Sequence, residues 1–226
     1  MEGLAHHQDV MVQAGALALP GFLAVPATAH GLIVFVHGSG SSRFSSRNRM
    51  VADALNAAGF ATLLFDLLTP EEARLDNHTG ALRFDIDFLS ARLRGVITSL
   101  ASRREVCHLP LGLFGASTGA AAALNAAVSC PQLVAAVVSR GGRPDLATVP
   151  LALVRAPTLL IVGSLDHEVI AFNRRAAVEL ECAHRLEIVH GATHLFEEPG
   201  TLEEVAKLAC AWFELHLRRT AIQPHA

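Results

Sequence analysis

The sequence lacks the cysteine patterns that mark disulfide-bonded or redox-active proteins. Its four cysteines, Cys107, Cys130, Cys182 and Cys210, are spread widely over 226 residues, and none forms a C-x-x-C pair. Such spacing offers no compact disulfide framework. We therefore expect free thiols in a reducing compartment.

Long apolar runs, a leader segment and a strong charge bias are also missing. No uninterrupted apolar stretch reaches the roughly 18 residues of a membrane span. The start, M-E-G-L-A-H-H-Q-D-V, lacks the positive region and apolar core of a signal peptide. A formal charge of -3 and a pI near 6.4 offer no basic surface for nucleic acid or an anionic membrane. We expect a cytoplasmic protein with neither partner, and a small neutral or anionic organic substrate stays open.

Hydrophobic residues, in contrast, are plentiful at 51% of the chain. That share and the length fit one α/β domain with a sizeable core over residues 1–226, in which residues 1–9 form a flexible tail. The sequence contains no internal repeat, low-complexity tract or linker. Nothing in it requires a second domain.

Short apolar runs alternate with helical patterns along the chain. We expect an opening antiparallel hairpin from residues 10–12 and 17–25, and buried strands at 31–36, 61–65, 111–114, 134–139, 158–162 and 185–189. Helical spacing covers residues 49–58, 84–102, 118–129, 169–180 and 202–217, with Trp212 on the inner face of the last helix. This alternation predicts an α/β fold with a mostly parallel eight-stranded sheet and helices on both faces.

The most informative stretch is L-G-L-F-G-A-S-T-G-A-A-A-A, in which Ser117 stands between Gly115 and Gly119. An apolar run, a sharp turn and a helix are the sequence form of a nucleophile elbow, G-x-S-x-G. The two glycines leave room where a side chain would strike a neighbouring strand or helix. A serine hydroxyl is a weak nucleophile by itself, so the interpretation needs a base, an orienting carboxylate and an oxyanion site.

Those partners follow other predicted strands. The carboxyl ends of parallel strands meet at one edge of a sheet, where ligands bind. Besides the elbow, three such loops carry suitable residues: His37-Gly38-Ser39-Gly40, Gly163-Ser164-Leu165-Asp166 and Gly191-Ala192-Thr193-His194. We expect all four loops to form one site.

With these motifs the chain resembles the α/β-hydrolase fold and, within it, the dienelactone-hydrolase-like serine hydrolases, from about Gly21 onward. The order Ser117, Asp166, His194 is the order that this fold uses. The resemblance implies that Ser117 attacks an acyl carbonyl, His194 transfers its proton, and Asp166 orients the imidazole.

The resemblance also implies an oxyanion hole made by the backbone N–H groups of Ser39 and Thr118. Dienelactone hydrolases proper use a cysteine nucleophile. The serine at position 117 therefore shifts the expected reaction toward ordinary carboxylic esters or thioesters. No metal or organic cofactor is implied.

Several alternatives stay open at this point. Asp145 follows the preceding strand and is a rival acid, and His190 is a rival base that we interpret as structural. His37 is better explained as a residue that shapes the oxyanion turn than as a catalyst. Arg140 and Arg143 follow the strand after the elbow and are candidates to bind a substrate carboxylate or phosphate, unless they are surface residues or pair with Asp145.

The connections bear on substrate size. Only 18 residues, Arg140 to Pro157, separate two late strands, too few for a large cap domain. The pocket should be open or covered only by the polar excursion 67–83, with a short helical turn at 71–75. We expect a serine esterase that acts on small acyl substrates, with an inactive binding module or an acyltransferase as the alternatives. A dehalogenase is disfavoured, because it would have a carboxylate in place of Ser117. Formation of a homodimer is left open.

Overall fold

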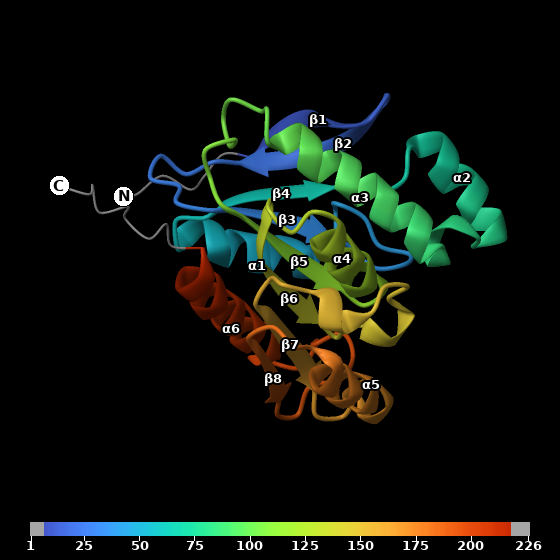
Figure 1. Ribbon diagram of the computed structural model, residues 1–226, viewed down its shortest axis with the longest axis vertical. Coiled ribbons are helices and arrows are strands. Elements are labelled where there is room, and N and C mark those ends of the chain that lie inside the picture. Colours follow the sequence, from blue (N-terminus) through green and yellow to red (C-terminus); the bar gives the residue numbers. More distant parts are fainter. Residues whose placement is uncertain (1–6, 218–226) are drawn as a thin grey trace.

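The computed structural model describes residues 7–217, which form one eight-stranded sheet with helices on both faces (Figure 1). The strand order is β1-β2-β4-β3-β5-β6-β7-β8. The strands are β1 (Gln8–Ala14), β2 (Leu17–Ala24), β3 (Leu32–Val36), β4 (Ala61–Phe65), β5 (Leu111–Ala116), β6 (Val134–Arg140), β7 (Thr158–Gly163) and β8 (His184–Val189). The β1–β2 and β2–β4 pairs are antiparallel and every other pair is parallel. The predicted fold and hairpin are confirmed.

Six α-helices lie among the described residues: α1 (Ser46–Ala57), α2 (Pro70–Thr79), α3 (Ile86–Leu100), α4 (Thr118–Ser129), α5 (His167–Glu179) and α6 (Thr201–His216). Helices α1 and α6 pack together on one face of the sheet, and α3 packs against α4 on the other. Helix α2 projects at the right of Figure 1, away from the sheet. The layers leave the carboxyl ends of the parallel strands free to carry loops.

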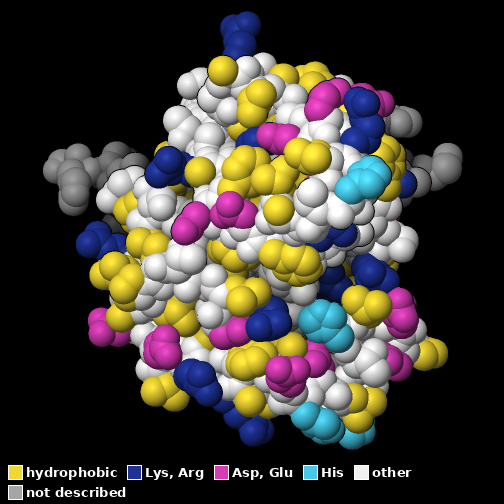
Figure 2. Space-filling view, turned by 90° about the vertical axis from the view of Figure 1, so that its right-hand side faces the viewer, with side chains coloured by type: hydrophobic (Ala, Val, Ile, Leu, Met, Phe, Trp, Pro, Cys, Tyr) yellow, Lys and Arg dark blue, Asp and Glu magenta, His cyan; other side chains and the backbone are white. Residues whose placement is uncertain are grey.

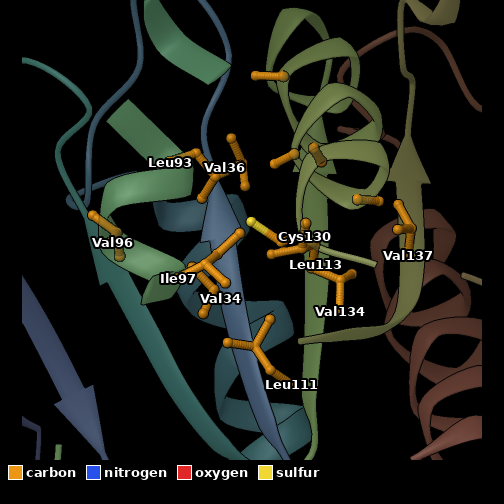
Figure 3. Packing of buried hydrophobic residues seen from close by; sticks show 14 of the residues in the cluster. Val34, Val36, Leu93, Val96, Ile97, Leu111, Leu113, Cys130, Val134 and Val137 are labelled. Atoms are coloured by element: carbon orange, nitrogen blue, oxygen red, sulfur yellow. The ribbon is translucent and has the colours of Figure 1, made fainter. Parts of the chain in front are cut away.

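The two faces of the sheet bury different side chains. Along β3, Val34 and Val36 face α3 and α4, whereas Ile33 and Phe35 face α1 and α6, because successive strand residues point to opposite sides. Figure 3 shows the first layer, in which strand valines and leucines meet Leu93 and its neighbours on α3. The second layer is richer in aromatic rings and includes Trp212, whose predicted inward position is confirmed.

Some element boundaries differ from the sequence predictions. Helix α1 begins at Ser46, before the predicted residue 49, because the Ser45 side chain caps it by accepting the Asn48 N–H. Helix α2 has ten residues in place of the expected short turn, because Thr69 and Glu72 form a reciprocal capping box ahead of it. Strand β1 includes residues 8 and 9, so these are not part of a tail; residues 1–6 lie outside the described part.

The segment after β6 contains no large cap. Two short 3-10 helices, η2 (Pro144–Leu146) and η3 (Leu151–Leu153), are the regular structure between β6 and β7. This agrees with the prediction from its length. Within residues 7–217, no helix combines the length and apolar character needed to cross a membrane.

Candidate active site

The loops that follow β3, β5, β7 and β8 meet at the carboxyl edge of the sheet. Figure 2 looks onto the side of the molecule that carries α2, where hydrophobic side chains lie among arginine or lysine, acidic and histidine side chains. Neither sign of charge dominates this surface. The chemistry of the site therefore depends on individual side chains.

The turn between β5 and α4 holds Ser117 in a strained backbone conformation, with φ 51° and ψ -122°. A Cβ at Gly119 would lie 2.2 Å from the Val36 carbonyl oxygen, and one at Gly115 would lie 2.5 Å from the Ala120 Cα. Both glycines are therefore required by close backbone packing, as the sequence predicts. Positive φ at a non-glycine residue costs energy and persists only where the surroundings enforce it.

Ser117, His194 and Asp166 form a continuous chain of polar contacts. The His194 Nε2 atom lies 3.3 Å from the Ser117 Oγ atom, and its Nδ1 atom lies 2.6 Å from the Asp166 Oδ2 atom. The Asp166 side chain is 14% exposed and that of His194 is 38% exposed. This is an arrangement in which an imidazole and a carboxylate can activate a serine hydroxyl.

The two residues expected to bind an oxyanion through their backbone N–H groups are in contact with each other. The Ser39 N–H donates to the Thr118 Oγ1 atom at 2.8 Å. The Thr118 N–H is at the first position of α4, where a helix has no internal acceptor for its amides. The side-chain contact of Thr118 was not foreseen from the sequence, which drew attention only to its backbone.

His37 is partly buried and supports the oxyanion turn through both of its ring nitrogens. Its Nε2 atom accepts the Leu67 N–H at 3.1 Å, so its Nδ1 carries the proton and donates to the Gly38 carbonyl at 3.0 Å. Burial lowers the pKa of His37, against the opposing effects of the Gly38 carbonyl and Asp66. A neutral imidazole engaged on both sides fits the structural role given to it from the sequence.

The rival acid and base are separate from this chain of contacts. Asp145 accepts two hydrogen bonds from Arg143, at 2.8 and 2.7 Å. These bonds raise the pKa of Arg143. Pairing with Asp145 was one of the alternatives for Arg143, and the structure contains this pair. His190 is exposed at the end of β8, and no contact joins it to Ser117 among the described residues.

Arg140, the other candidate for substrate binding, has a different environment. It is 7% exposed at the end of β6, and burial, followed by the nearby charge of Arg47, lowers its pKa to about 10. Its Nη2 atom lies 3.4 Å from the Asn48 Oδ1 atom. Asn48 was not among the predicted site residues, and only the cap signal at Ser45 could have located its helix end.

A cavity of about 230 Å³ lies between the oxyanion turn and the excursion that carries α2. Its walls are residues 37–42 on one side and Leu67, Leu68, Ala73, Asp76, Asn77, Arg83 and Leu89 on the other. The excursion covers the cavity, as expected from the sequence. We call residues 67–84 the lid.

Two ion pairs hold the lid. Arg92 on α3 donates to both carboxylate oxygens of Glu72, at 2.7 and 3.0 Å, and to the Leu67 carbonyl. Arg83 Nε lies 2.5 Å from the Asp76 Oδ2 atom. The Arg92 hydrogen bond lowers the pKa of Glu72 despite its burial. For Asp76, burial raises the pKa, but the hydrogen bonds from Arg83 and Leu82 outweigh this effect, so the pKa is lowered overall.

Within residues 7–217, no group of three or more histidine, cysteine, aspartate or glutamate side chains is placed to hold a metal ion. The cysteines among these residues are all free thiols. Burial raises the pKa of Cys130, Cys182 and, to about 11, Cys210, which makes them poor nucleophiles. In this site, Ser117 is the residue whose hydroxyl contacts an imidazole, that of His194.

Comparison with known proteins places this site in a family context. The pattern of the Dienelactone hydrolase family matches residues 19–218. Two proteins from strains of Mycobacterium tuberculosis are 57% identical over 210 residues and carry the provisional name of phosphoribosyl transferase. The alignment covers 93% of this chain but only 46% of theirs, so the chain spans about half the length of these curated relatives.

Solved structures give the same family and fold. A dienelactone hydrolase from Anabaena variabilis is 52% identical, with a TM-score of 0.94, over 96% of this chain and 100% of that one. A dienelactone hydrolase-like promiscuous phosphotriesterase from metagenomic libraries is 17% identical, with a TM-score of 0.74, over 95% of this chain and 99% of its own. The second similarity concerns the fold alone.

Proposed function

Because the chain belongs to the dienelactone hydrolase family, we propose that it is a serine hydrolase that cleaves carboxylic esters or related acyl compounds through an acyl-enzyme. The observation that carries the proposal is the contact chain from Ser117 through His194 to Asp166, at 3.3 and 2.6 Å. The comparisons show that the chain belongs to this family; the hydrolase activity, the ester class and the residue roles are the proposal.

In the proposed reaction, the Ser117 hydroxyl attacks the acyl carbonyl while His194 Nε2 takes its proton. Asp166, bonded to Nδ1, holds the tautomer that leaves Nε2 free to accept and stabilises the imidazolium. The tetrahedral intermediate collapses when His194 returns the proton to the leaving group. Water, deprotonated by the same histidine, then releases the acid from Ser117.

The oxyanion of the intermediate would bind the Thr118 N–H and the Ser39 N–H. Each such donor contributes about 2.7–4 kcal/mol to lowering the barrier. The Ser39 N–H already contacts Thr118 Oγ1, and one N–H can be shared between two acceptors. The Thr118 hydroxyl would therefore keep the Ser39 amide in position before substrate binds.

The cavity beside the oxyanion turn favours small acyl substrates. At about 230 Å³ it is below the roughly 300–1,000 Å³ of pockets that take drug-sized ligands. Leu67, Leu68 and Leu89 give it an apolar lining that suits a short acyl or alcohol chain. We propose a cytoplasmic enzyme that acts without a cofactor. The transferase name belongs to relatives about twice as long as the region they share with this chain, so we do not assign that activity to it.

The test is a pair of measurements on the wild type and Ser117→Ala. We expect the wild type to hydrolyse short p-nitrophenyl esters and to be labelled by a fluorophosphonate at Ser117. The variant should fold, by circular dichroism, and lose both. A wild-type protein with neither activity nor labelling would identify the fold as an inactive binding module instead. Faster release of p-nitrophenol when an alcohol is added would indicate transfer of the acyl group to that alcohol.

A further inference from the structure

Arg140 is a buried cation next to the catalytic centre. It is the register partner of Ala116, the residue before the nucleophile, and its carbonyl accepts the Ser117 N–H at 3.1 Å. A Cβ at Gly141, the next residue, would lie 3.2 Å from the His194 carbonyl oxygen. The backbone at Arg140 and Gly141 thus lies against both the Ser117 turn and the loop that carries His194.

The guanidinium of Arg140 has few partners for its five N–H groups. Within residues 7–217 no carboxylate forms an ion pair with it, and its buried Nε atom has no hydrogen-bond partner. Its one hydrogen bond, to Asn48, is long at 3.4 Å, and its Cζ atom lies 5.9 Å from the centre of the Phe196 ring. Burying a charge in this way is costly unless an anion meets it.

A second cation adds to the positive charge at this place. Arg47, in the first turn of α1, is close enough to lower the pKa of Arg140, after the larger effect of burial. It donates to Glu197 at 2.9 Å, but its Nε atom is also buried without a partner. The first turn of α1 has no acidic residue, and the amino end of a helix carries partial positive charge.

We propose that Arg140, with Arg47 and the amino end of α1, binds an anionic oxygen group of the acyl substrate, a carboxylate or a phosphate, beside His194. We call these groups the anion subsite. The planar guanidinium matches both anions in geometry, and a bound anion would give partners to the buried N–H groups. The inference rests on the proposed function for the reaction, but the binding itself is testable without turnover.

Two esters of equal acyl length test the subsite in catalysis: p-nitrophenyl hemisuccinate, which ends in a carboxylate, and neutral p-nitrophenyl butyrate. We expect kcat/KM for the hemisuccinate to exceed that for the butyrate. In Arg140→Gln this ratio should fall about tenfold or more, since a charged hydrogen bond is lost. Arg140→Lys should restore part of it. The matched control is Arg143→Gln, which removes an arginine already paired with Asp145 and should leave the ratio unchanged.

Binding without turnover is measured on Ser117→Ala by the change in its melting temperature with added succinate or inorganic phosphate. A rise with succinate assigns the subsite to carboxylates, and a rise with phosphate assigns it to phosphate esters. Either rise should disappear when Arg140→Gln is added. Arg47→Gln should reduce it, and because its side chain is 32% exposed, this variant keeps the test valid if Arg140→Gln does not fold.

The outcomes that overturn the proposal are distinct from a failure of the hydrolase assignment. If Arg140→Gln lost activity on both esters equally, Arg140 would only support the loop at Phe196 and would not bind an anion. Absence of a melting-temperature change with both anions would also refute the subsite. If the wild type hydrolyses no ester, the proposed function fails, while the anion-dependent shift still decides the subsite.

Discussion

The elbow around Ser117 and the lid are held in place by different means. The elbow consists of backbone in close contact, where Gly119 leaves no room for a Cβ and Ser117 is held at positive φ. The lid is held to α3 by the Glu72–Arg92 ion pair and internally by the Asp76–Arg83 ion pair, and Leu75 on its outer side is 62% exposed. Close packing fixes the position of Ser117, whereas the lid is held by side-chain ion pairs that do not include Ser117. We therefore expect the elbow to determine the reaction and the lid to affect substrate binding.

The largest effect is expected at a glycine of the elbow. Gly119→Val should yield no folded protein, because its Cβ would lie 2.2 Å from the Val36 carbonyl oxygen. In the lid, Gly80 has φ 65° and no atom within 4 Å of a Cβ position, so Gly80→Ala should cost only about 1–2 kcal/mol. Soluble yield and thermal unfolding measure both. Equal damage from the two substitutions would remove the distinction between the elbow and the lid.

The second largest effect concerns the acid of the site. Asp166→Asn should lower kcat by about 10⁴-fold, because an amide stabilises the wrong tautomer of His194. The matched control is Asp145→Asn, at the rival acid, which is bonded to Arg143 and should keep at least most of the activity. Initial rates on a p-nitrophenyl ester measure both variants. A large loss in Asp145→Asn alone would transfer the acid role to that residue.

A smaller effect is expected at the lid pair. Arg83→Gln removes the ion pair with Asp76 and should raise KM for a butyrate ester by roughly fivefold, equivalent to about 1 kcal/mol. The rate of fluorophosphonate labelling at Ser117 should not change. Arg74→Gln, which removes an exposed pair on the outside of the same helix, is the control. A fall in kcat with unchanged KM would place Arg83 among the residues that act on the reaction itself.

The smallest effect depends on pH. The pKa of Glu72 is lowered in the folded protein, chiefly by the Arg92 hydrogen bond, so this pair stabilises the fold above the unfolded pKa of about 4.3 and loses that contribution as pH falls through the folded value. Glu72→Gln should therefore melt a few degrees below the wild type at pH 7, for a loss of about 1 kcal/mol. The gap should narrow below about pH 4.3. A gap that stays constant with pH would assign the loss to packing.

The same contrast explains what the sequence could predict. The strands could be predicted from apolar runs, and the loops at Ser117, Asp166 and His194 from local motifs and chain order. The structure brings these three residues into contact. The length of α2 was missed, although the capping box at Thr69 marks its start. The environment of Arg140 could not be predicted, because it depends on α1, 92 residues earlier in the chain.

The strand order also has a consequence for how activity arises during synthesis. Ser117 follows β5, near the middle of the sheet, but His194 follows β8, which is added last at the edge beside β7. Under the proposed mechanism, a growing chain that ends before β8 lacks His194, the base that would activate Ser117. We therefore expect hydrolytic activity only after the carboxyl-terminal edge of the sheet has formed, and we expect a nascent or truncated chain to escape acylation at Ser117.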